Sequence, residues 1–191
     1  MTLDEIRKRI DTIDPQLRDL LMERMDCAYH VAQAKFAENS TTVYRADREK
    51  EIIDQLSADV PEDRKAQYIS VIRKIMESSR MYQYCLLYDW NGEESVFTPL
   101  LNGKTIPEKC SRVQISLTRI DRPNAMSEIL SMIGDYGFDM EKMELIEHDT
   151  VSQNVTFHLT ILGNLNETRM KKLLFQLSRE CDRFRFLEAF E

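Results

Sequence analysis

Residues 3–37 read LDEIRKRIDTIDPQLRDLLMERMDCAYHVAQAKFA, and this stretch decides the fold. Its apolar residues recur every three or four positions, which is the pattern of one long amphipathic helix with a buried stripe. The stripe keeps its phase across Pro15, so we expect a continuous or slightly bent helix. Its members are Leu3, Ile6, Ile10, Ile13, Leu17, Leu20, Ala28 and Val31.

Two cationic residues, Arg24 and Lys35, lie on this apolar stripe. Their separation in sequence places them about 20° apart around the helix and roughly 16 Å apart along its axis. An unpaired cation in a protein core is strongly destabilising, so each needs an anionic partner. The sequence therefore predicts a pocket for an anion inside a helical bundle.

The overall composition excludes several classes of protein. The 191 residues are 42% hydrophobic and 31% charged, which is ordinary for a globular chain. A formal net charge of -7 argues against a nucleic-acid partner. No apolar run is long enough to cross a membrane, and residues 1–10 have no signal-peptide core, so we expect a cytoplasmic protein with free thiols. The three histidines lack metal-ligand spacing, so no metal site is expected.

The chain has two parts with different hydrophobic periods. Residues 1–90 form a helical domain, residues 91–110 a linker rich in Asn-Gly and Pro turns, and residues 111–191 a second domain with alternating strands and helices. In the first domain we expect helices over residues 3–37, 46–56 and 63–88.

The second domain has the element order βαββαβ, which is a ferredoxin-like α+β unit. Asn166 is the expected N-cap of its second helix. We expect strands over residues 113–117, 140–148, 151–162 and 184–190, and helices over residues 123–136 and 166–181.

Seven polar residues of the helical domain stand in a distinctive order and spacing: Arg7, Arg24, Lys35, Arg48, Glu49, Ser79 and Gln83. Taken singly, each has an ordinary structural explanation, such as a solvated ion pair. Taken together, they resemble the polar residues of all-helical chorismate mutases, a class of intertwined dimers of three-helix chains. Residues 111–191 resemble an ACT domain, a module that senses amino acids or forms dimers.

The resemblance implies a pericyclic rearrangement of chorismate to prephenate, with no cofactor and with a homodimer as the functional unit. Lys35 and Gln83 would donate to the ether oxygen, where negative charge develops in the transition state. Glu49 would accept a hydrogen bond from the ring hydroxyl. Binding of the two carboxylates would fall to Arg24, Arg7, Arg48 and Ser79.

Helix geometry adds an expectation about Arg7. It lies about 25 Å from Arg24 along a continuous helix, so the two arginines of one chain cannot easily reach one small substrate. We therefore expect Arg7 to serve a site whose other residues belong to a second chain. One departure from the family pattern is Arg45, which stands where an acidic residue is common.

The role of the ACT-like domain stays open between dimerisation and sensing of an aromatic amino acid. If a ligand binds, we expect the turn that contains Asp121, Asn124 and Ala125 to hold its carboxylate, because a helix N-terminus offers free backbone donors. Two other functions remain possible for the whole chain. One is an isochorismate pyruvate lyase on the same scaffold, and the other is a non-catalytic ACT regulatory protein.

Overall fold

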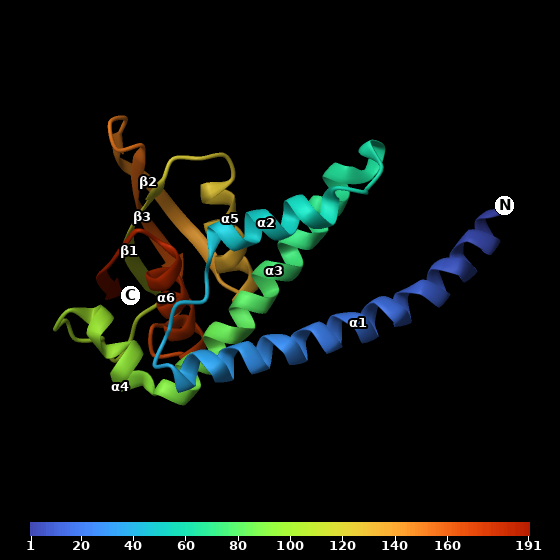
Figure 1. The fold of residues 1–191 in the computed structure, drawn as a ribbon. Helices are drawn as coiled ribbons and strands as arrows, with labels where there is room; N and C mark the ends of the chain where they lie inside the picture. Colours follow the sequence, from blue (N-terminus) through green and yellow to red (C-terminus); the bar gives the residue numbers. More distant parts are fainter.

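The first helix, α1 (Leu3–Ala37), is unbroken across Pro15, as the sequence predicts. A capping box starts it: the Glu5 backbone N–H donates to the Thr2 hydroxyl, and the Glu5 carboxylate accepts from the Thr2 N–H at 2.7 Å. In the computed structural model, which describes all of residues 1–191, α1 is a long, gently curved rod (Figure 1). None of the helices is both long and apolar enough to cross a membrane.

The other two long helices are α2 (Ala46–Ser57) and α3 (Glu62–Asn91), within a few residues of their expected bounds. Figure 1 shows α2 running alongside α3, with the C-terminal part of α1 against the far end of α3. Of the residues in α1, Ala28 and Ala32 are buried. These three helices confirm the predicted helical domain.

The apolar stripe of α1 is not buried within one chain, so the expectation of a buried stripe is wrong for the single chain. Leu3, Leu17 and Leu20 have exposed fractions of 61%, 52% and 63%. The reason is geometric, because the N-terminal half of α1 extends beyond every other element and meets no partner (Figure 1).

The C-terminal part is a four-stranded antiparallel sheet with two helices. The strands are β1 (Arg112–Ile120), β2 (Asp139–Asp149), β3 (Asn154–Leu162) and β4 (Arg183–Phe190), in the spatial order β2-β3-β1-β4. The helices are α5 (Ala125–Asp135) and α6 (Thr168–Glu180). Alternate residues of β1 are buried, as a sheet with one covered face requires. This topology confirms the predicted ferredoxin-like fold.

One predicted cap is wrong. Helix α6 begins at Thr168 with Glu167 as its N-cap. The Asn166 side chain instead donates to the backbone carbonyls of Pro107 and Glu108, at 3.1 and 3.3 Å. Asn166 therefore ties the chain before α6 to the segment before β1.

The helical and α+β parts share one hydrophobic core. Phe175 of α6 packs against Tyr84 and Tyr88 of α3, with ring centroids 5.8 and 6.1 Å apart. The segment between α3 and β1 contains a short helix, α4 (Glu93–Val96), and a 3-10 helix, η1 (Thr98–Leu101). Phe97 is fully buried in the same core. The ferredoxin-like part is thus packed directly on α3, rather than tethered at a distance.

Candidate functional site

Arg24 and Ser79 meet where α1 crosses α3. The Arg24 Nη1 atom donates to the Ser79 hydroxyl, and that hydroxyl lies 3.8 Å from the Met25 sulfur. Ser79 is buried, whereas Arg24 is largely exposed. The structure therefore brings together two of the predicted site residues from different helices. The guanidinium keeps donors that no other side chain of the chain occupies.

Gln83 lies one helical turn after Ser79, on the same side of α3. Its side-chain nitrogen donates to the Ser79 backbone carbonyl at 3.3 Å. Its oxygen, Oε1, is buried and has no hydrogen-bond partner. A buried polar atom without a partner is destabilising, and such atoms are found at sites that accept a polar ligand. The amide nitrogen has two N–H donors, so Gln83 can donate to a ligand while it keeps its bond to the Ser79 carbonyl.

Lys35 lies at the C-terminal end of α1. Its ammonium group donates to the backbone carbonyl of Thr42, in the loop that leads to α2. It makes no contact with Arg24 or Gln83 within the chain. The ammonium has three N–H donors, so two remain for a bound anion while the Thr42 carbonyl keeps the third.

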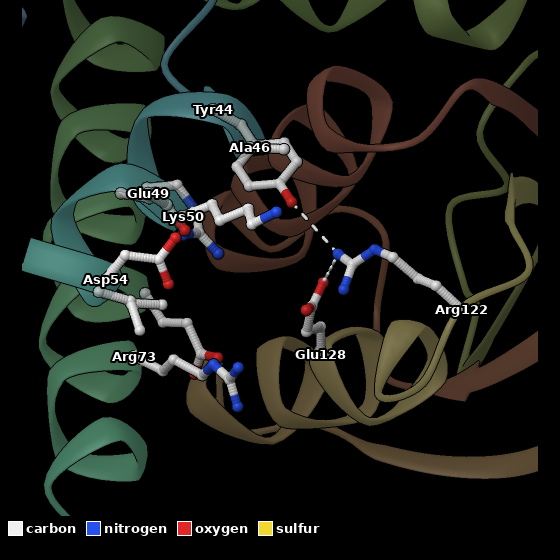
Figure 2. A pocket seen from close by; sticks show the side chains of 11 residues that line it. Tyr44, Ala46, Glu49, Lys50, Asp54, Arg73, Arg122 and Glu128 are labelled. Carbon is white, nitrogen blue, oxygen red and sulfur yellow. Dashed lines mark hydrogen bonds and ion pairs between the residues drawn. The ribbon is translucent and has the colours of Figure 1, made fainter. Parts of the chain in front are cut away.

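Glu49 lies in a separate environment, the cavity between α2, α3 and α5 (Figure 2). Its carboxylate pairs with Arg80 of α3. The cavity has a volume of about 430 Å³, and its charged lining includes Lys50 and Arg73. None of the other predicted site residues lines this cavity.

Two further predicted residues, Arg7 and Arg48, lie in solvent. Arg7 pairs with Asp4 at 3.6 Å, and Arg48 pairs with Glu51 at 3.0 Å. Both pairs join neighbouring turns of one helix, where they contribute little to stability. Neither arginine shares a hydrogen-bond or ion-pair partner with Arg24 within the chain.

Arg45 forms a local pair with Asp47 just before α2. Its guanidinium donates to both carboxylate oxygens, at 3.1 and 2.7 Å. This hydrogen bonding, with help from the Arg48 backbone N–H, lowers the pKa of Asp47 to about 2. The charge of Arg45 is thus compensated by its neighbour.

Arg80 is a buried residue of this region that the sequence pattern does not predict. It is buried, and its Nε atom donates to the Glu180 carboxylate of α6 at 3.1 Å while Nη1 donates to Glu49. Burial alone would lower the pKa of Arg80, but Glu180 and Glu49 raise it above its usual value. The side chain of Gln176 also donates to Glu180, at 2.8 Å. No local signal could have found this network, because Arg80 and Glu180 are 100 residues apart.

The proposed effector turn precedes α5. Asn124 adopts a left-handed conformation, with φ of 70°, and lines a second cavity of about 470 Å³ beside α3. Asp121 and Ala125 do not line it. The Asp121 carboxylate lies 3.0 Å from the His148 Nε2 atom, and the Ala125 carbonyl accepts from Arg119 at 3.2 Å. The three residues therefore point to different surroundings.

These observations define a class of protein: a three-helix region with cationic and amide groups where two helices cross, packed on a ferredoxin-like sheet. Residues 6–84 match the family model described as chorismate mutase type II. The N-terminal helices are a domain of that family, and the α+β part has an ACT-like topology.

Comparison with solved structures finds a prephenate dehydratase from Arthrobacter aurescens in complex with L-Phe. The sequences are 21% identical, and the TM-score is 0.41. The match covers 46% of this chain and spans 29% of that chain. Comparison with curated proteins gives no match.

Proposed function

We propose that this chain is a chorismate mutase, which converts chorismate to prephenate in aromatic amino-acid biosynthesis. The observation that carries the proposal is the group of Arg24, Ser79 and Gln83 where α1 crosses α3, inside the segment that matches the chorismate mutase type II family. Arg24 presents unused guanidinium donors, and the Gln83 amide nitrogen has a second N–H donor beside the one that it gives to Ser79. Both features suit a small, highly polar anion.

The chemistry explains why such groups suffice. Chorismate is a dianion whose ether bond breaks as a carbon–carbon bond forms, and negative charge grows on the ether oxygen. When the site holds the side arm over the ring, the substrate loses its conformational entropy on binding, so this loss no longer adds to the activation barrier. Donors at the ether oxygen stabilise the transition state more than the ground state. Lys35 and Gln83 are the proposed donors, and Arg24 holds a carboxylate.

The proposal includes a homodimer. The exposed apolar residues of α1 form a long face that a second α1 would cover, and burial of such residues contributes about 1.5–3 kcal/mol each. Pairing of this kind would also bring Arg7 of the second chain toward Arg24 of the first. The active unit would then have two equivalent sites, each completed by both chains.

We further propose that the ACT-like part either responds to an aromatic amino acid or contributes to dimerisation. The support for a ligand role is the cavity lined by Asn124, with Arg73 and Lys74 of α3 on its opposite wall. A ligand there would contact both parts of the chain at once. Activity measured with and without phenylalanine and tyrosine separates the two roles.

Purified protein is expected to convert chorismate to prephenate in the presence of a metal chelator. The reaction is followed by the loss of chorismate absorbance, and the product is identified by chromatography. An unchanged rate after chelation is expected because no step needs a metal ion. A rate no higher than that of the uncatalysed reaction would refute the proposal, and release of pyruvate from isochorismate would indicate the lyase instead.

A Gln83→Glu variant is expected to be active only at acidic pH. The ionised carboxylate would repel the charge that develops on the ether oxygen, whereas the protonated acid can donate a hydrogen bond to it. A glutamate has a reference pKa of about 4.3, so activity should fall steeply as pH rises above the value of the new side chain. The measurement is kcat against pH for parent and variant. Parallel profiles would show that Gln83 does not contact the reacting oxygen.

A further inference from the structure

Only one of the two oxygens of the Glu49 carboxylate forms a hydrogen bond within the chain. Its Oε1 atom accepts from Arg80, whereas Oε2 accepts no hydrogen bond from the chain. The side chain is 23% exposed and lines the cavity between α2 and α5 (Figure 2). A carboxylate has two acceptor oxygens, so one is fixed here while the other is free for an incoming donor.

Arg80 is itself held on several sides. Its side chain is 8% exposed, and its guanidinium carbon lies 4.8 Å from the centre of the Tyr44 ring. The Arg80 Nε atom donates to Glu180, whose side chain is 2% exposed. Glu180 in turn accepts from Gln176, and the Gln176 oxygen accepts from the Tyr136 hydroxyl at 2.9 Å. An unbroken chain of hydrogen bonds thus leads from the ferredoxin-like part to Glu49.

We infer that Arg80 is a positioning residue that orients Glu49 for the substrate hydroxyl, and that Glu180 of α6 anchors Arg80 from the ferredoxin-like part. This inference rests on the proposed function. The orientation of Glu49 in the helical domain would then depend on the position of α6. Arg80 also directly follows Ser79 in α3, so one short segment connects the Arg24 group with the Glu49 cavity.

The choice of arginine has a physical reason. A guanidinium carries five N–H donors in a rigid fork, so it can bind two carboxylates in different directions at once. A lysine ammonium is a single point of charge on a flexible stem and would hold one carboxylate loosely. An Arg80→Lys variant should therefore fold but fail to restore the orientation of Glu49.

The test compares kinetic constants of variants that leave no lone buried charge. Removing Arg80 alone would strand Glu180 in the core, which is strongly destabilising, so the main variant is the neutral pair Arg80→Gln with Glu180→Gln. We expect KM for chorismate to rise about tenfold with kcat nearly unchanged, because contact with a hydroxyl that does not react contributes equally to ground state and transition state. Arg80→Lys should show a similar rise.

A double-mutant cycle distinguishes the positioning of Glu49 by Arg80 from a general structural effect of the substitutions. Glu49→Gln should raise KM by a similar factor, and adding the neutral pair to Glu49→Gln should raise it little further, because both changes remove one interaction. The matched control is Glu93→Gln with Lys171→Gln, which removes another ion pair between α6 and the helical side, with atoms 2.6 Å apart. That control should leave KM unchanged. Thermal unfolding verifies that every variant is folded at the assay temperature.

Each outcome has one meaning. Additive effects of Glu49→Gln and the neutral pair, or an unchanged KM in the neutral pair, would overturn the inference while the proposed function stands. A comparable rise in KM in the Glu93–Lys171 control would also overturn it, because any loosening of α6 would then have the same effect. A parent protein without mutase activity would refute the proposed function, and the inference would fall with it.

Discussion

Replacement of Arg24 by alanine is expected to lower kcat/KM for chorismate by roughly 100- to 1000-fold. Arg24 is exposed in the free chain, but with substrate it would form a desolvated charge pair, and truncating one partner of such a pair costs about 2–5 kcal/mol. Arg24 is the proposed cation for a substrate carboxylate, and Ser79 orients it through a hydrogen bond. No other basic side chain donates a hydrogen bond to Ser79 or Gln83 in the chain.

The measurement is steady-state kinetics beside thermal unfolding. The matched control is Arg18→Ala, which removes another arginine of α1, one that pairs with Asp19 in solvent. Arg18→Ala should keep parental kinetics, since exposed ion pairs contribute little. An Arg24→Ala protein that is folded and retains more than about a tenth of the parental kcat/KM would contradict the assignment.

Mixing of two inactive variants is expected to restore activity, which is the second large effect. Arg7→Ala and Arg24→Ala homodimers should each be nearly inactive, because every site would lack one arginine. A mixed dimer has one site with both lesions and one site with none. Random exchange of equal amounts should then recover roughly a quarter of the parental activity, as expected for a symmetric dimer.

The exchange is performed by brief partial denaturation and refolding of the mixture, and the dimer is verified by sedimentation equilibrium. Each variant treated alone in the same way is the control for reactivation. Mixtures without recovery, despite demonstrated exchange, would show that Arg7 does not complete a site of the second chain. A monomeric and active parent protein would contradict the shared site as well.

Local sequence determined the individual elements. The spacing of apolar residues predicts α1 from Leu3 to Ala37, and Thr2 with Glu5 supplies the capping interactions that start it. Alternation in β1 and the order of strands and helices predict the ferredoxin-like topology, because right-handed, short connections allow few arrangements. The resemblance to a known family pointed to Arg24, Ser79 and Gln83, which the fold brings together where α1 crosses α3.

Only the tertiary structure decided which faces meet. The buried face of α3 formed by Tyr84, Leu87 and Tyr88 depends on contact with α6, and a helical period cannot reveal a partner so far along the chain. The pairing of Glu49 with Arg80 and the link from Arg80 to Glu180 have the same origin. Periodicity reports local geometry alone, whereas the pairing of buried charges is decided by which surfaces pack together, because burial forces each charge to find a partner.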